Sequence, residues 1–188
     1  KNIVVLSDGT GQEGGVGYNT NIYKIFNMLE DRTGNQVAFY DPGLGTDRKK
    51  IAGLIAGAGI SKNILDCYKF IFEHYNAGDQ IFLFGFSWGA STVRSLASFI
   101  HLFGVLPKSR PDLIEKAYDI YTISNRQKRE TLAHDFIKRH HTMWTRIKFI
   151  GCFDTVAALG LPSKFLNAIL EIIPWYKNDF HDFKLSES

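Results

Sequence analysis

The chain of 188 residues lacks the features that define several protein classes. Its two cysteines, Cys67 and Cys152, are too few for a disulfide framework, and their patterns predict buried thiols. No stretch reaches 18 uninterrupted apolar residues, so a membrane-spanning segment is not expected. Internal repeats and low-complexity segments are also absent. These absences argue against a disulfide scaffold, an integral membrane protein and a repeat array.

Clustered metal ligands and a basic stripe are missing as well. The cysteines stand alone in the sequence, and the adjacent His140 and His141 cannot share one face of a helix. The net charge is only +3, and the basic residues are spread along the chain. We therefore predict no metal, no cofactor and no nucleic-acid partner. The oligomeric state stays open.

Short apolar runs alternate with helical patterns along the chain. Strands are predicted at 3–6, 36–40, 80–84 and 147–152, and helices at 21–29, 62–75, 89–102, 110–122 and 126–140. This alternation is typical of an α/β fold whose mainly parallel sheet carries helices on both faces. A helical insertion is expected at about 107–145, after the helix that follows the third strand. Residues 1–188 are interpreted as one domain, as the 45% hydrophobic content allows.

The most informative motif is the Gly-x-Ser-x-Gly sequence around Ser87. A strand-like apolar run precedes Gly85, and a helical pattern follows Gly89. This is the strand–turn–helix context of a nucleophile elbow, in which a tight, strained turn exposes a serine hydroxyl. The competing interpretation is an ordinary strand-to-helix turn with a capping serine. The context favours Ser87 as a nucleophile.

A serine nucleophile needs a base, and the base needs an acid that orients it. Asp154 ends the fourth predicted strand, where such an acid is expected, although it could also cap the next helix. The histidine is expected after the acid in the chain, and His181 is the one histidine that follows Asp154. His181 is therefore a candidate base, with an ordinary structural role as the alternative.

The loop after the first strand offers a partner for the elbow. Backbone N–H groups of Gly9 and Thr10, together with the N–H of Trp88, could form an oxyanion hole. For the Asp8 side chain two roles stay open, one in this site and one in bonding the loop to itself.

The same loop also matches a rival motif. Gly9, Gly11 and Gly14 fit Gly-x-Gly-x-x-Gly after a strand, which is the pattern of a dinucleotide-binding site. Two features oppose this alternative. The glycines continue into a polar loop instead of opening a helix, and Asp8 would place a carboxylate beside the pyrophosphate.

Several segments together resemble one family. They are Ser7–Thr10, Thr20–Asn21, Tyr40–Thr46, Gly78–Ile81, Gly85–Ala90 with Arg94 and Ala97, and Gly151–Gly160. These segments resemble the DUF2235 group of α/β-hydrolases, which includes the catalytic domain of the family 1 lipase effectors of type VI secretion. The resemblance covers nearly the whole chain. Trp88 departs from the family, in which arginine is usual at that position.

The resemblance implies an α/β-hydrolase fold and a Ser–Asp–His esterase of the phospholipase A type, with Ser87 and Asp154 on the matching positions. The expected substrate is an ester or lipid, with contact to a membrane surface. The family's histidine motif is not found before Ser188. We therefore expect a domain truncated at its C-terminus, whose base is either His181 or a later histidine. A non-catalytic interaction domain with this fold is a further alternative. The expected location is the cytoplasm, or outside after export without a signal peptide.

Overall fold

The computed structural model describes residues 1–9, 15, 19–30, 33–43 and 54–153. Within them, four parallel strands form one sheet in the order β2-β1-β3-β4. The strands are β1 (Asn2–Ser7), β2 (Gln36–Asp41), β3 (Gln80–Phe86) and β4 (Ile147–Phe153). Each lies within two residues of the predicted strand, which confirms the α/β class.

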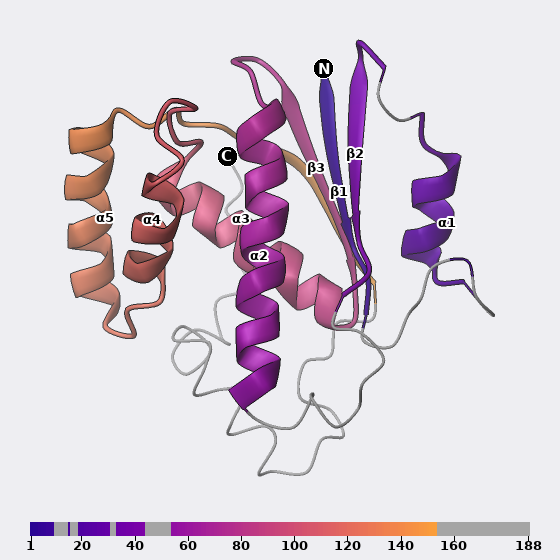
Figure 1. The fold of residues 1–188 in the computed structure, drawn as a ribbon, viewed down its shortest axis with the longest axis horizontal. Coiled ribbons are helices and arrows are strands. Elements are labelled where there is room, and N and C mark those ends of the chain that lie inside the picture. The colour runs from indigo at the N-terminus through magenta and orange to yellow at the C-terminus, as the bar shows by residue number, and fades with distance from the viewer. Residues whose placement is uncertain (10–14, 16–18, 31–32, 44–53, 154–188) are drawn as a thin grey trace.

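Helices lie on both faces of this sheet. They are α1 (Asn21–Met28), α2 (Leu54–His74), α3 (Trp88–Phe103), α4 (Leu113–Tyr121) and α5 (Arg126–His140). Figure 1 shows α1 on one side of the sheet and α2 and α3 on the other, with α4 and α5 outside them. α4 and α5 lie between α3 and β4 in the chain, as expected for the helical insertion.

The start of α2 differs from the prediction. The helix begins at Leu54, eight residues before the predicted start at residue 62. The sequence ahead of residue 62 contains Gly57 and Gly59, which lower intrinsic helix propensity and resemble a loop. Propensity is a weak guide here, because the long helix packs against β2 and α3.

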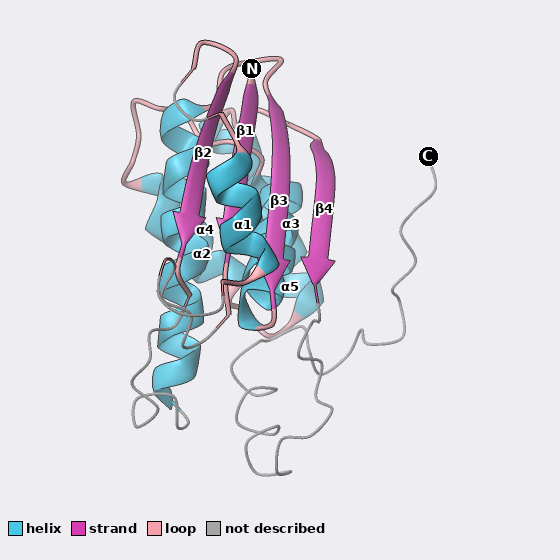
Figure 2. Ribbon diagram, turned by 90° about the vertical axis from the view of Figure 1, so that its right-hand side faces the viewer, coloured by secondary structure: helices cyan, strands magenta, loops and turns pink. Residues whose placement is uncertain are grey.

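The alternation of side chains along β1 and β3 divides the apolar core between the two faces. Ile3, Val5, Ile81 and Leu83 are fully buried and belong to the large cluster with α2 and α3. The other face of β1 packs on α1 through Ile22 in a smaller cluster. In Figure 2, α1 lies in front of the centre of the sheet, whereas β4 at the sheet edge has no helix in front of it.

Cys152 corrects one prediction. Cys67 is buried in the core as expected, but Cys152 is exposed. Cys152 lies on β4, which forms one edge of the described sheet, where fewer neighbours cover a side chain. The apolar residues around Cys152 in the sequence predict a strand, but they do not predict that this strand lies at the edge of the sheet.

The strand order creates a switch point between β1 and β3. The chain leaves β1 through α1 towards β2, and it leaves β3 through α3 towards β4, on the opposite side. In open parallel sheets, ligands bind outside the carboxyl ends of the strands at such a point. The turns after Ser7 and Phe86 both lie there. In the part of the chain that the structure describes, no helix is long and apolar enough to span a bilayer.

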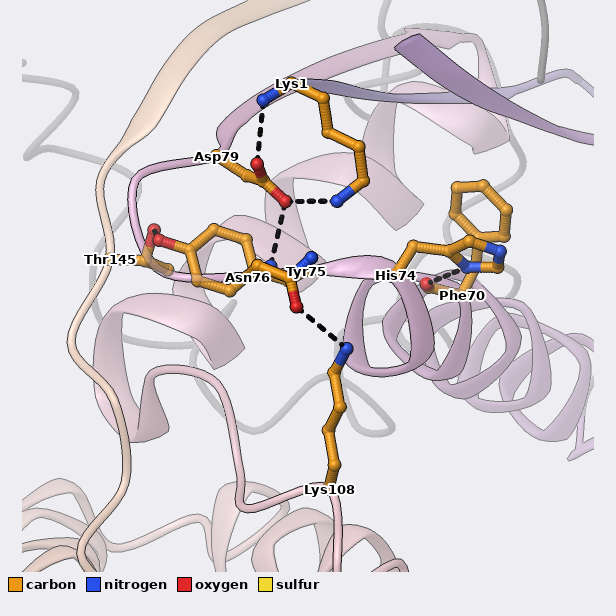
Figure 3. A network of polar contacts seen from close by, with 8 residues as sticks. All are labelled: Lys1, Phe70, His74, Tyr75, Asn76, Asp79, Lys108 and Thr145. Atoms are coloured by element: carbon orange, nitrogen blue, oxygen red, sulfur yellow. Dashed lines mark hydrogen bonds and ion pairs between the residues drawn. The ribbon is translucent and has the colours of Figure 1, made fainter. Parts of the chain in front are cut away.

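The opposite, amino edge of the sheet is closed by side-chain contacts (Figure 3). Asp79 accepts hydrogen bonds from the Lys1 ammonium and from the Asn76 N–H, the latter at 2.8 Å. Nearby, the buried Thr145 hydroxyl donates to the Tyr75 hydroxyl at 2.8 Å. These contacts join the turn before β3 to the start of the chain and to the approach to β4.

Candidate active site at the carboxyl edge of the sheet

Ser87 stands between β3 and α3 in a strained backbone conformation. Its φ is 54° and its ψ is −117°, and it is one of two described non-glycine residues with positive φ. Such a conformation is unfavourable for a residue with a side chain and persists only where surrounding structure imposes it. The residue is half-buried. This is the geometry of a nucleophile elbow.

The two glycines of the motif allow the backbones to approach closely. A Cβ atom on Gly85 would lie 2.4 Å from the Gly89 carbonyl oxygen. A Cβ atom on Gly89 would lie 2.0 Å from the Ser7 carbonyl oxygen. Any side chain at either position would therefore separate the elbow from β1 or open the turn itself.

The loop after β1 lies directly against Ser87. A Cβ atom on Gly9 would lie 3.1 Å from the Ser87 Cβ atom and 3.1 Å from the Phe86 ring. On its other side the loop meets Gly43, where a Cβ atom would lie 2.5 Å from the Asp8 carbonyl oxygen. The structure thus brings Asp8 and Gly9, two of the predicted site residues, to Ser87.

The Asp8 side chain is fully buried and engaged within the protein. Its carboxylate accepts the Gly9 N–H at 2.9 Å, the Thr20 hydroxyl at 2.6 Å and the Tyr40 hydroxyl at 2.8 Å. Burial, followed by the hydrogen bond to Asp8, raises the pKa of Tyr40, which keeps this phenol a donor. The geometry corresponds to the loop-bonding alternative for the Asp8 side chain, and it engages the Gly9 N–H.

A second buried carboxylate, Asp41, ends the neighbouring strand β2. It accepts the Ser7 hydroxyl at 2.7 Å and the Gly43 N–H at 3.0 Å. Burial raises the pKa of this carboxyl group, although both hydrogen bonds oppose the shift. Asp41 therefore ties the end of β2 to the end of β1 beside the elbow.

The start of α3 gives this edge a positive potential. Trp88 is the first residue of a helix of 16 residues, so its N–H has no acceptor within the helix. The aligned peptide dipoles favour negative charge at this end. The Trp88 side chain is half-buried against the large core cluster, and its backbone N–H lies next to Ser87 in the chain. An oxyanion that forms on an acyl group at Ser87 can be stabilised there.

Phe153 brings the end of β4 to the elbow. Its carbonyl oxygen accepts the Ser87 N–H at 3.1 Å, and the paired residues Phe86 and Phe153 end the β3–β4 ladder. The next residue in the chain is Asp154. Asp154, Thr10 and His181 all lie outside the described residues, so their predicted roles stay predictions.

The histidines of the described residues lie on helices α2, α3 and α5 or at their ends. They are His74, His101, His134, His140 and His141. His101 shares α3 with the elbow but lies in its last turn, about 20 Å from the helix start at 1.5 Å per residue. His101 is therefore too far along α3 to act as the base for Ser87. Across the described ranges there is also no cluster of three residues that could hold a metal ion.

Sequence reasoning placed Thr20 and Tyr40 in motif segments but gave neither residue a role at this edge. Thr20 caps α1 by accepting the Tyr23 N–H at 3.1 Å, and its hydroxyl also donates to Asp8. Tyr40 reaches the same carboxylate from β2. Thr20 could have been found from the helix start, because threonine ahead of an apolar-periodic run signals an N-cap. No pattern in the sequence predicts that both hydroxyls meet Asp8.

Comparison with known proteins identifies the family of the chain. The chain is 31% identical over 186 aligned residues to "Uncharacterized protein YEL023C" of Saccharomyces cerevisiae. The match covers 86% of this chain and 27% of that relative, so the chain spans about a quarter of the relative's length. No solved structure matches the chain. The family model described as "T6SS, Phospholipase effector Tle1-like, catalytic domain" matches residues 1–188, and the chain therefore belongs to this family, as its motifs predicted.

Proposed function

We propose that this chain carries the nucleophile of a serine esterase that cleaves carboxylic ester bonds of phospholipids. One observation carries the proposal. Ser87 is held at a φ of 54° between a parallel strand and a helix start, with the Gly9 backbone packed against it. A stable fold has little reason to keep a strained, accessible serine at a switch point unless the hydroxyl reacts. The family supports a phospholipid as the substrate class.

In the proposed reaction, the Ser87 Oγ attacks the ester carbonyl carbon while a histidine takes its proton. The carbonyl oxygen becomes an oxyanion, which the Trp88 N–H and the Thr10 N–H would stabilise, since the Gly9 N–H is engaged by Asp8. Collapse expels the alcohol, which receives the proton from the histidine. Water then attacks the acyl-enzyme by the same route and releases the fatty acid.

Asp154 is proposed as the acid that orients this histidine. It follows Phe153 in the chain, and the Phe153 carbonyl accepts the Ser87 N–H, which supports this assignment. The base is His181 or a histidine that follows residue 188 in the natural protein.

A fluorophosphonate probe tests the nucleophile, because it reacts with activated serines. We expect stoichiometric labelling of the natural full-length protein, with the label on the peptide that contains Ser87. Ser87→Ala should abolish labelling. Ser91→Ala is the matched control, because Ser91 lies one turn further along α3 and should label as the wild type does. Equal labelling of wild type and Ser87→Ala would exclude this function.

Fatty-acid release from phosphatidylcholine vesicles tests the substrate class. We expect release by the wild type and none by Ser87→Ala. If the wild type is labelled by the probe but releases no fatty acid, the serine is reactive and the phospholipid assignment is wrong. If neither activity appears, the alternative of a non-catalytic domain with this fold gains support.

The dinucleotide alternative fits the structure less well. α1 begins at Asn21 with Thr20 as its cap, whereas Gly9 follows β1 directly. A phosphate site needs the helix N-terminus at the glycine-rich turn. Calorimetry with NAD and NADP should therefore give no binding signal.

A further inference from the structure

The carboxylate of Asp8 is the most heavily hydrogen-bonded charged group at the active edge. It has no exposed surface and accepts three hydrogen bonds of 2.6–2.9 Å. The donors come from three separate segments: Gly9 after β1, Thr20 at the cap of α1, and Tyr40 on β2. A buried carboxylate is stable only when such donors satisfy it, so the whole arrangement is organised around this group.

One of the three bonds acts on the loop that faces the nucleophile. The Gly9 N–H points to Asp8 Oδ1, which sets the orientation of the planar peptide between the two residues. The other side of that peptide is limited by close backbone contacts with Gly43 and Gly89. The loop is thus held on both sides, and Asp8 supplies the directional contact.

The position of this loop matters because Gly9 touches the elbow. The site of a Gly9 Cβ atom is 3.1 Å from Ser87 Cβ, so a small rotation of the loop would change the space beside the hydroxyl. Oxyanion donors must be placed to within a few tenths of an ångström, and a displacement of about 1 Å can lower a rate about 10²-fold.

We propose that Asp8 is a positioning residue of the active site. Its carboxylate fixes the backbone at Gly9 against Ser87 by joining it to Thr20 and Tyr40, and it does not contact the substrate. The inference rests on the proposed esterase function and adds to it a residue that acts through the loop.

Asp41 provides a matched comparison. It is also a buried aspartate at the end of a neighbouring strand, with an exposed fraction of 6% against 0% for Asp8. Its side chain binds Ser7 and Gly43 and does not bond to Gly9. A purely structural role for both carboxylates predicts similar effects of their removal, whereas a positioning role for Asp8 predicts a difference in catalysis.

The experiment compares Asp8→Ala and Asp41→Ala in the natural full-length protein with a short-chain p-nitrophenyl ester. Thermal denaturation first defines a temperature at which both variants are folded. For Asp8→Ala we expect kcat to fall about 10²-fold with KM changed by less than about twofold, because the loop serves the transition state. For Asp41→Ala we expect a clearly smaller fall in kcat than for Asp8→Ala, because Asp41 reaches this peptide only through Gly43. Asp8→Asn keeps an oxygen for the Gly9 N–H and should recover most of the lost rate.

Three results decide the proposal. The role of Asp8 is overturned if folded Asp8→Ala keeps the wild-type kcat, or if kcat falls equally in both alanine variants. In either case, labelling of wild-type Ser87 still supports the esterase. Failure of wild-type Ser87 to react with the fluorophosphonate probe overturns both. If Asp8→Ala does not fold, Tyr40→Phe decides instead: it removes one donor to Asp8, and a severalfold fall in kcat is expected, whereas an unchanged kcat overturns the proposal.

Discussion

The two edges of this sheet are built from the same strands but in different ways. At the carboxyl edge, Ser87 is strained, and backbones approach so closely that Gly85 and Gly89 can carry no side chain. At the amino edge, side-chain contacts such as that between Lys108 and Asn76 join ordinary turns (Figure 3). At the carboxyl edge, the strained backbone holds Ser87 and Gly9 in position but lowers the stability of the fold. At the amino edge, hydrogen bonds and ion pairs between side chains stabilise the fold without straining the backbone.

The largest expected effect comes from filling a close approach. Gly89→Ala places a Cβ atom 2.0 Å from the Ser7 carbonyl oxygen, so β1 and α3 must separate. We expect a loss of at least about 3 kcal/mol of unfolding free energy. Gly34→Ala, in the turn before β2, is the control, because nothing lies within 4 Å of its Cβ position. Its effect should stay within about 0.5 kcal/mol by urea denaturation. Similar losses at both glycines would contradict the contrast between the edges.

The strain at Ser87 predicts a variant that is more stable and inactive. Glycine adopts a φ of 54° without steric penalty, so Ser87→Gly should raise the unfolding free energy by about 1 kcal/mol while probe labelling disappears. Ser98→Gly, inside the same helix, should lower the unfolding free energy by about 0.5 kcal/mol. Urea denaturation of both variants measures whether the unfolding free energy rises or falls in each. A loss of stability in Ser87→Gly would show that the elbow is not strained.

The two edges should also respond oppositely to pH. Burial raises the pKa of Asp41, so the folded state binds more protons than the unfolded state above about pH 4, and the Asp41 contribution to stability falls as pH rises. Burial would also raise the pKa of Asp79, but hydrogen bonds from Lys1 and Asn76 outweigh it and lower the pKa to about 2. The Asp79 contribution is therefore present above about pH 4 and lost as pH falls towards 2.

Asn substitutions isolate these contributions. The stability of Asp41→Asn relative to wild type should rise from pH 4 to 7. The stability of Asp79→Asn relative to wild type should fall from pH 2 to 4 and stay low at higher pH. Denaturation series over this pH range measure both differences, and slopes of the same sign would contradict the assignment.

The smallest effect is expected at the exposed side of the amino edge. Lys108 donates to the Asn76 side chain at 3.3 Å in an exposed position. Lys108→Ala should change the unfolding free energy by less than about 0.5 kcal/mol, because exposed polar contacts compete with water. A larger loss would mean that this edge is more tightly organised than its exposure indicates.

Much of the fold could be predicted from the sequence, because each strand is a short apolar run and most helices have a clear apolar stripe. The strand ends were predicted to within two residues for the same reason. Because the ends of β1 and β3 were known, the sequence could place the loop at Asp8 near Ser87. The predicted start of α2 at residue 62 was wrong, because Gly57 and Gly59 lower helix propensity and make the first turns resemble a loop in the sequence. The exposure of Cys152 could not be predicted, because being at a sheet edge depends on strand order.

The sequence by itself determined the α/β class, the elbow at Ser87 and the family, since these depend on local periodicity and on residues adjacent in the chain. The tertiary structure decided what the Asp8 side chain does. Its hydrogen-bond partners Thr20 and Tyr40 are 12 and 32 residues away. Tyr40 meets it because the parallel strands β1 and β2 end at one edge, and Thr20 meets it because α1 begins at that edge. The same packing placed Gly9 against Ser87, so the motif serine lies in an organised surrounding that supports its proposed role as a nucleophile.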